Sequence, residues 1–224
     1  MGNMTVPRAD VDGVITIKEV STPTAKADNG QVYTKTDNNL YFQDGAGTEQ
    51  VVLKGGTHTI FVPAAAMYPN TTNGCAALAQ VELSNGPEIK VLDFDPSSDE
   101  FAQFTVAFPK SWNEGTVTFQ AFFTVTGTNT GTVKWTLAGR SFADNAALNT
   151  AFGTAVGPAA KAHSGTSNDI NVTATSGAVT IAGAAADTLT FFEVSRDVSA
   201  DDQSGDARLL GIKIYYTIDS GNDA

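Results

Sequence analysis

The stretch GTVTFQAFFTVT, Gly115–Thr126, alternates between apolar and polar residues along almost its whole length. Because successive side chains of a strand point to opposite faces, this pattern predicts a long β-strand with one apolar and one threonine-rich face. Its apolar face comprises Val117, Phe119, Ala121, Phe123 and Val125. Only Phe122 breaks the alternation, on the polar side. Such a strand cannot bury its apolar face alone, so a second sheet must pack against it.

Similar short apolar stretches, separated by turn sequences, lie on both sides of this strand. The expected neighbouring strands are His58–Val62, Ala77–Leu83, Ile89–Phe94, Ala102–Phe108, Thr132–Gly139, Thr188–Val198 and Leu209–Ile218. About eight to ten short strands with almost no helix are typical of a sandwich. We therefore expect residues 57–224 to form an all-β, jelly-roll-like antiparallel β-sandwich.

Three local features of this domain are also expected. GTNTG, Gly127–Gly131, predicts a hairpin that pairs Gly115–Thr126 with Thr132–Gly139. A second hairpin is expected over residues 170–182, around Ser176–Gly177. Ser141–Ala151 is the best candidate for a helix.

The N-terminal segment, residues 1–56, is predicted to hold a small β-ribbon. Its expected strands are Val32–Thr36, Leu40–Gln43 and Thr48–Leu53, after a flexible start at Met1–Asp10 and a strand at Val14–Val20. A three-stranded ribbon this thin is marginal as a monomer, so it must pack on the main domain or on copies of itself. We expect a docking and trimerisation segment. Candidate subunit contacts are Tyr33, Leu40, Tyr41 and Phe42, together with Phe122, because an exposed Phe on a polar face is costly unless a neighbour covers it.

The charge balance argues against several partners. With 24 acidic and 13 basic residues, the formal net charge is −11, which repels nucleic-acid phosphates. The single cysteine, Cys75, excludes an intrachain disulfide and is expected to be a small buried hydrophobe. The start MGNMTVPRAD lacks the apolar segment of a signal peptide. No run approaches the roughly 20 apolar residues that span a bilayer, so we expect no membrane insertion.

Candidate chemistry is sparse in this sequence. Two acidic clusters hold the oxygen ligands that calcium prefers: Asp93, Asp95, Asp99 and Glu100, and then Asp201, Asp202 and Asp206. Neither cluster has EF-hand spacing, so solvated turns are favoured over metal sites. Neither histidine lies in a nucleophile motif, and no phosphate loop, dinucleotide fingerprint or zinc spacing occurs. We expect no catalytic residue, no metal and no cofactor.

Aromatic residues outside the expected strand cores are candidates for ligand contact. Tyr68, Trp112 and Tyr215 could stack on sugar rings if they are exposed. For Trp112, a plug at the end of the sandwich is favoured, because large aromatic side chains are mostly buried.

Several stretches resemble structural proteins of tailed bacteriophages. The ribbon GQVYTKTDNNLYFQDGAGTE, Gly30–Glu49, resembles a short element near the start of tail-fibre-like and other virion appendage proteins. Phe61–Glu82, Val91–Asp95, Phe108–Phe123 and Asp206–Ala224 resemble a group of uncharacterised phage structural proteins. The resemblance implies a virion component, a homotrimer and contact with other virion proteins through the N-terminal segment. It implies no catalytic residues.

Three functional hypotheses follow. The leading one is a trimeric surface appendage of a tailed phage, either a tail fibre or spike or a head decoration, made without a signal peptide and placed in the virion, where it contacts the host. The alternative is a carbohydrate-binding module that recognises host surface glycans. A polysaccharide depolymerase is the least favoured, because such chains are usually longer and repeat-built, and no solenoid period occurs here.

Overall fold

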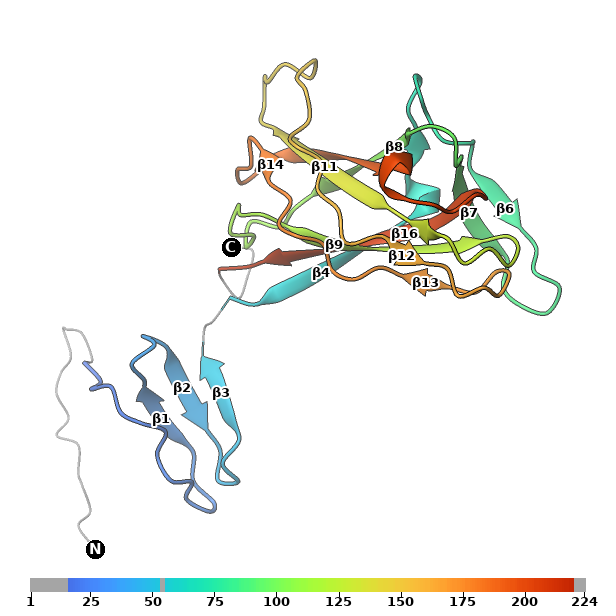
Figure 1. Ribbon diagram of the computed structural model, residues 1–224. Helices are drawn as coiled ribbons and strands as arrows, with labels where there is room; N and C mark the ends of the chain where they lie inside the picture. The colour runs from blue at the N-terminus through green and yellow to red at the C-terminus, as the bar shows by residue number, and fades with distance from the viewer. Residues whose placement is uncertain (1–15, 53–54, 220–224) are drawn as a thin grey trace, which may run out of the picture. The chain divides into compact units, whose positions relative to one another are not determined.

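A computed structural model describes residues 16–52 and 55–219 of the chain. It divides the chain into two compact units, Met1–Lys54 and Gly55–Ala224 (Figure 1). The predicted flexible start, Met1–Asp10, and the first two residues of the strand expected at Val14–Val20 lie outside the described residues. No helix in the described part of the chain is long and apolar enough to cross a membrane.

The first unit is a three-stranded antiparallel meander in the order β1-β2-β3. Its strands are β1 (Gln31–Thr34), β2 (Leu40–Gln43) and β3 (Glu49–Val52). Tight turns join them, one with Asn38 and one with Gly47 at positive φ. The rest of the strand expected at Val14–Val20 is reduced to one parallel bridge, between Glu19 and Thr34.

Two stacked tyrosines form the small core of this unit. Tyr33 and Tyr41 lie side by side on β1 and β2, with ring centroids 5.7 Å apart. Tyr33 donates its hydroxyl hydrogen bond to Glu49, and Glu49 also pairs with Lys35 at 2.7 Å. Tyr41 donates to Asp37 at 2.5 Å. Every charged group around the core therefore has a partner.

The second unit is an antiparallel β-sandwich, which confirms the predicted fold class. One sheet has the order β14-β11-β15-β8-β5, and the other has β13-β9-β16-β7-β6 with β4 also paired to β16. The single parallel pair among these strands is β11 with β14. The strand bounds are β4 Thr57–Pro63, β5 Tyr68–Pro69, β6 Ala79–Val81, β7 Ile89–Phe94, β8 Glu100–Ala107, β9 Thr118–Val125, β11 Trp135–Phe142, β13 Asn171–Val172, β14 Ile181–Ala182, β15 Leu189–Arg196 and β16 Ala207–Thr217. The short pair β10 (Thr132–Val133) and β12 (Lys161–Ala162) lies apart from both sheets, and two 3₁₀ turns complete the unit, η1 Ala64–Ala66 and η2 Val198–Ala200.

The core lies between the two sheets and includes the apolar face predicted from the opening stretch. Phe119, Ala121, Phe123 and Val125 of β9 are fully buried. Across the sandwich, Trp135 of β11 packs edge-on against Phe94 at 4.9 Å and also contacts Phe123 at 6.0 Å. The alternating pattern of one strand therefore identified one wall of the core correctly.

Three local predictions were wrong. Instead of forming a hairpin, β9 and β11 lie in different sheets, so the Gly127–Gly131 turn carries the chain across the sandwich. The second expected hairpin is also split, because β13 pairs with β9 whereas β14 pairs with β11. The helix expected at Ser141–Ala151 is replaced by the end of β11 and a loop, because Ser141 and Phe142 continue the pairing with β15.

Candidate functional site

The outer face of the five-stranded sheet carries the most site-like surface of the second unit. Strand pairing places Ala138, Glu193, Gln103 and Tyr68 in one row across β11, β15, β8 and β5. The next row holds Arg140, Phe191 and Thr105, and the one after it Phe142, Leu189 and Ala107. These side chains point away from the core because their strand neighbours point into it.

A loop, residues 143–152, follows β11 and forms a wall over this face. A cavity of about 250 Å³ lies between them, lined by Gln103, Phe142, Phe191 and, from the loop, Leu148, Thr150 and Phe152. A second, more open hollow of about 460 Å³ lies beside it, where Asp187 and Leu189 join Phe142, Phe191, Leu148 and loop residues 143–146. Both cavities share the rings of Phe142 and Phe191, which meet edge to face at 5.7 Å.

A third hollow continues the surface towards β5. It measures about 260 Å³ and is lined by Gln103 and by the run Tyr68, Pro69, Asn70, Thr71 and Thr72. Because Gln103 lines this hollow and the first cavity, and Phe191 lines the first and the second, the three hollows are neighbours along this face, and together we treat them as a groove. The groove crosses the strands from β5 to the loop after β11. We refer to it as the outer groove.

A carboxylate organises the polar floor of the outer groove. The Glu193 Oε2 atom accepts a hydrogen bond from Asn70 Nδ2 at 2.7 Å and another from Gln103 Nε2 at 3.2 Å. The Asn70 Oδ1 atom is buried and has no hydrogen-bond partner in the part of the chain that the structure describes. The two amides are therefore held by the same oxygen, and each directs its nitrogen towards it.

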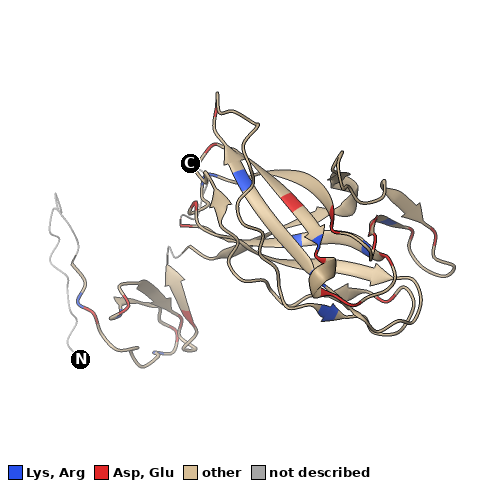
Figure 2. Cartoon of the chain, turned by 45° about the horizontal axis from the view of Figure 1, so that its top comes forward, with Lys and Arg blue, Asp and Glu red and all other residues tan. Residues whose placement is uncertain are grey.

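Charge on this sheet is low, and its cations are engaged with the backbone. Figure 2 shows acidic residues mainly in loops, with few charged residues along the strands. Arg140 donates to the Ala151 carbonyl at 3.2 Å and lies 5.8 Å from the ring centroid of Phe142. Lys134 donates to the Pro158 carbonyl at 2.5 Å. Neither cation is among the residues that line the groove.

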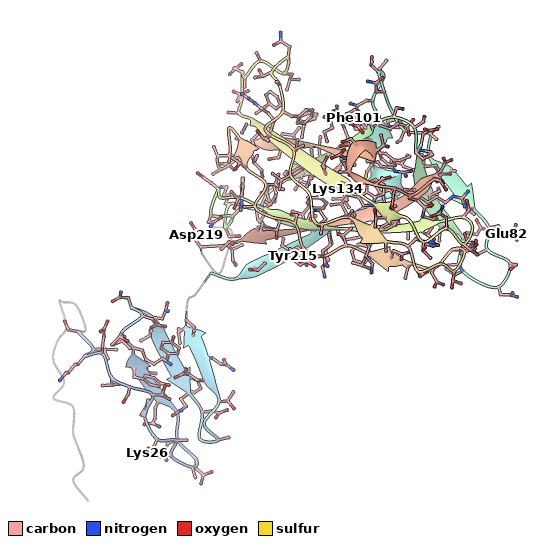
Figure 3. The ribbon with its side chains drawn as sticks, in the orientation of Figure 1. Lys26, Glu82, Phe101, Lys134, Tyr215 and Asp219 are labelled. Atoms are coloured by element: carbon pink, nitrogen blue, oxygen red, sulfur yellow. The ribbon has the colours of Figure 1, made fainter. Side chains whose placement is uncertain are left out.

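The three predicted ligand contacts fall in three different places. Tyr68 is 48% exposed and lines the outer groove. Trp112 is only 3% exposed and stacks on Phe108 at 4.3 Å, so its ring is packed in the core and is not available to a ligand. Tyr215 lies on the outer face of the other sheet, where its hydroxyl donates to Gln120; Figure 3 shows it on the side of the sandwich opposite Phe101 of β8. These residues do not form one site.

The predicted subunit contacts are also divided. Tyr33 and Tyr41 are buried within the first unit, which corrects the prediction that they form a surface contact. Leu40 and Phe42 lie on the opposite face of the ribbon, where Phe42 is 39% exposed. Phe122 is half-buried, because Phe61 of the same chain packs edge-on against it at 5.7 Å. A contact within the same chain therefore accounts for the partial burial of Phe122, and no second subunit is required.

The first acidic cluster serves structural roles within the chain. Asp95 accepts hydrogen bonds from Ser97, and Glu100 accepts one from the Asp95 backbone. Asp93 pairs with Arg208 at 3.2 Å, although burial raises the pKa of its carboxyl above the usual range. Within residues 16–52 and 55–219, no group of three or more His, Cys, Asp or Glu side chains is placed to hold a metal ion.

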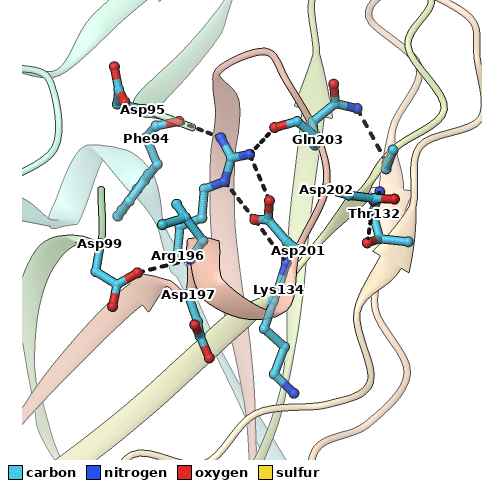
Figure 4. Close-up of polar contacts among 12 residues, drawn as sticks. Phe94, Asp95, Asp99, Thr132, Lys134, Arg196, Asp197, Asp201, Asp202 and Gln203 are labelled. Carbon is cyan, nitrogen blue, oxygen red and sulfur yellow. Dashed lines mark hydrogen bonds and ion pairs between the residues drawn. The ribbon is translucent and has the colours of Figure 1, made fainter. Parts of the chain in front are cut away.

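The second acidic cluster surrounds a buried arginine (Figure 4). Arg196 donates to both carboxylate oxygens of Asp201 and to the carbonyls of Phe94, Gln203 and Gly205. Asp202 accepts from the Thr132 hydroxyl at 2.7 Å and Asp99 from the Val198 backbone at 2.9 Å. These carboxylates fix the loop between β15 and β16.

The single cysteine is not a candidate nucleophile. Burial raises the pKa of the Cys75 thiol to about 12, which disfavours the thiolate that a nucleophile needs.

Sequence reasoning missed the residues at the centre of the outer groove. The sequence FF in β15 offered a signal, because Phe192 belongs to the core alternation and Phe191 must then point outwards. Glu193 and Gln103 offered no signal, because single polar residues on strands normally face water. Only the pairing of β15 with β8 brings these two side chains together.

No protein-family model matches this chain, and no curated protein sequence matches it. Among solved structures, it is similar to a CBM36-1 domain of a multidomain xylanase from the hindgut metagenome of Trinervitermes trinervoides, with 13% identity and a TM-score of 0.36 over 70% of this chain and 96% of that one. It is also similar to a family 11 carbohydrate-binding module from Clostridium thermocellum, with 8% identity and a TM-score of 0.36 over 73% of this chain and 89% of that one. A third similar structure contains the CBM22-1 and GH10 modules of a Clostridium thermocellum xylanase, with 13% identity and a TM-score of 0.39 over 77% of this chain and 30% of that one. Similarity at this level does not specify a ligand.

Proposed function

We propose that the second unit is a carbohydrate-binding module and that the outer groove is its ligand site. The observation that carries the proposal is that half-buried aromatic rings and hydrogen-bonding amides line adjacent hollows on one face of the sheet. Phe142 and Phe191 form the apolar part, and Gln103 and Asn70 the polar part, with Tyr68 at one end. Ligand sites are typically such concave, largely apolar surfaces with a few fixed polar groups.

This combination suits a sugar ring in particular. A pyranose has apolar C–H faces and a rim of hydroxyl groups, so it packs flat on an aromatic ring while its edges form hydrogen bonds. The groove crosses β5, β8, β15 and β11, a span of about 14 Å at ordinary strand spacing. That length accommodates a short run of consecutive sugars.

Binding without cleavage is the activity we propose. Hydrolysis of a glycosidic bond usually requires two carboxyl groups on either side of it. The carboxylate at the polar floor, Glu193, instead accepts hydrogen bonds from two amides, as expected of a residue that orients its neighbours rather than one that cleaves a bond.

Affinity measurements on paired phenylalanine variants test this function. We expect a panel of soluble polysaccharides to contain a binder, and Phe191→Ala to weaken its binding about tenfold, because truncation of an aromatic anchor removes a large contact. The matched control is Phe61→Ala, since Phe61 is 53% exposed on the outer face of the other sheet. If no polysaccharide binds, or if both variants lose binding equally, the outer groove is not a carbohydrate site.

We further propose that the ribbon assembles this module into a virion appendage, as the resemblance to phage structural proteins implies. The supporting observation is a partly exposed face of the ribbon, formed by Val32, Thr34, Leu40, Phe42, Gln50 and Val52. None of these six side chains is charged, and Val32 is 58% exposed. An apolar face of this kind is typical of a subunit contact.

The mass of the full chain in solution tests this second proposal. We expect a trimer, and we expect Val32→Glu to yield monomers, because a charge in an apolar contact is unfavourable. Ile170→Glu is the control, since Ile170 is 64% exposed in the sandwich and outside the ribbon. A monomeric wild-type chain, or a Val32→Glu variant that stays trimeric, contradicts assembly through this face.

A further inference from the structure

The outer groove presents a hydrogen-bond acceptor at its polar end, and Glu193 is the reason. An ionised carboxylate only accepts hydrogen bonds, so the atoms that approach its Oε2 at 2.7 and 3.2 Å must be the NH₂ groups of Asn70 and Gln103. This fixes the amide orientation of both residues. Because the Asn70 Oδ1 atom is buried, the carbonyl oxygen of Gln103 is the one left for a ligand.

Gln103 stands at the point where this orientation matters most. It lines both the hollow beside Tyr68 and the cavity beside Phe191, so a chain that follows the groove passes over it. The Asn70 Oδ1 atom is buried, so a ligand in the groove does not reach it. The oxygen of Gln103 therefore calls for a ligand that donates a hydrogen bond.

We infer that Glu193 is a positioning residue that makes the outer groove selective for neutral, hydroxyl-rich glycans over glycans that carry carboxylates. This inference rests on the proposed carbohydrate-binding function. Sugar hydroxyls can donate to the oxygen of Gln103, whereas a uronate carboxylate cannot. The negative charge of Glu193 and the net charge of −11 oppose the approach of an anion as well.

The nearest cation does not reverse this preference. Arg140 is one row away from Glu193 on the same face, but its guanidinium lies over Phe142 and donates to the Ala151 carbonyl. It is not among the residues that line the groove. At the other end, the charged lining residues are Asp144 and Asp187, which also repel anions.

Titration calorimetry with the full chain tests the inference. The probes are two neutral polysaccharides, mixed-linkage β-glucan and galactomannan, and two anionic ones, polygalacturonate and alginate. We expect the wild-type chain to bind a neutral probe and neither anionic one. Tight binding of polygalacturonate or alginate by the wild-type chain overturns the selectivity and leaves the carbohydrate-binding function standing, whereas no binding to any probe overturns that function itself.

Two variants separate positioning from simple charge removal. In Glu193→Gln, the new amide can donate as well as accept. The side-chain amide of Gln103 can then turn over, so that its nitrogen faces the ligand. We expect binding of the neutral probe to weaken about five- to tenfold, because one well-oriented hydrogen bond is lost. We also expect the variant to gain binding to polygalacturonate. In Gln103→Met, which keeps the Glu193 charge, we expect the same loss of neutral binding without that gain.

The matched control is Glu82→Gln, which makes the same change of charge at an exposed position outside the groove. We expect it to bind all four probes like the wild-type chain. If Glu193→Gln retains wild-type affinity for the neutral probe, Glu193 does not position the amides and the inference is wrong.

Discussion

Arg196 and Asp201 form an ion pair that is almost completely closed off from solvent. Their side chains are 0% and 2% exposed, and two hydrogen bonds join them, Nε to Oδ2 at 2.7 Å and NH2 to Oδ1 at 3.1 Å. The remaining guanidinium hydrogens reach three backbone carbonyls, so the charge is fully satisfied. The pair ties the end of β15 to the loop that leads into β16.

We expect Asp201→Ala to destabilise the sandwich strongly. Removal of the carboxylate leaves Arg196 buried and uncompensated, a change that typically costs about 3–5 kcal/mol. Chemical denaturation monitored by tryptophan fluorescence measures the free energy of unfolding. The pair of Asp93 and Arg208, whose side chains are 21% and 20% exposed, provides the more solvated control, and Asp93→Asn should cost about 1 kcal/mol. Equal losses for both variants contradict the special role of the buried pair.

The alternation of apolar and polar residues predicts the buried face of each strand separately, and this much of the fold could be predicted from the sequence. The opening strand, Gly115–Thr126, correctly predicted a sandwich because all the residues on its inner face are apolar. Sheet membership could not be predicted in this way. Trp135 and Phe123 belong to strands that are adjacent in sequence, yet they face each other across the core, and local alternation is the same in either arrangement.

The candidate site was harder to predict because strand pairing assembles it. Tyr68 was identified as an aromatic residue outside the expected strands, and it does line the groove. Gln103 and Glu193 lie 90 positions apart in sequence, and neither has a distinctive local context. Trp112 shows the opposite failure, because residue type suggested a ligand contact that burial excludes.

The burial of Trp112 predicts a large effect on stability and none on binding. Trp112→Ala removes a side chain that stacks on Phe108 at the end of the sandwich, and such truncations typically cost about 3–5 kcal/mol. We expect the fraction that remains folded to bind polysaccharide with wild-type affinity. A variant of normal stability that has lost binding would restore Trp112 as a ligand contact.

The ribbon should be the more acid-sensitive of the two units. In the ribbon, hydrogen bonds from Lys35 and Tyr33 lower the pKa of Glu49, and that from Tyr41 lowers the pKa of Asp37 to about 2. A depressed folded pKa adds stability above the ordinary pKa, which is lost as pH falls through the folded value. We therefore expect the ribbon to loosen progressively below pH values of about 4.

In the sandwich the shifts oppose one another, because hydrogen bonds lower the pKa of Asp95 and Asp202, whereas burial raises the pKa of Asp93 and Glu100. A raised folded pKa gives stability that is present below the ordinary pKa and is lost as pH rises through the folded value. Through Asp93 and Glu100, acid therefore stabilises the folded sandwich. NMR spectra of the full chain between neutral pH and pH 2 distinguish the units through the ring signals of Tyr41 and Trp135. Loss of the Trp135 signals before those of Tyr41 contradicts the expected order.

Tyr68 is the one sequence-predicted ligand contact that lies in the outer groove, and its variants test the extent of the site. Its ring is 48% exposed and lines the hollow beside Gln103, so truncation removes little packing from the core. We expect Tyr68→Ala to weaken polysaccharide binding about fivefold, as for a peripheral aromatic contact, with an unchanged melting temperature. Tyr215→Ala on the opposite face is the control and should bind like the wild-type chain. If Tyr215→Ala weakens binding and Tyr68→Ala does not, the ligand face is the other sheet.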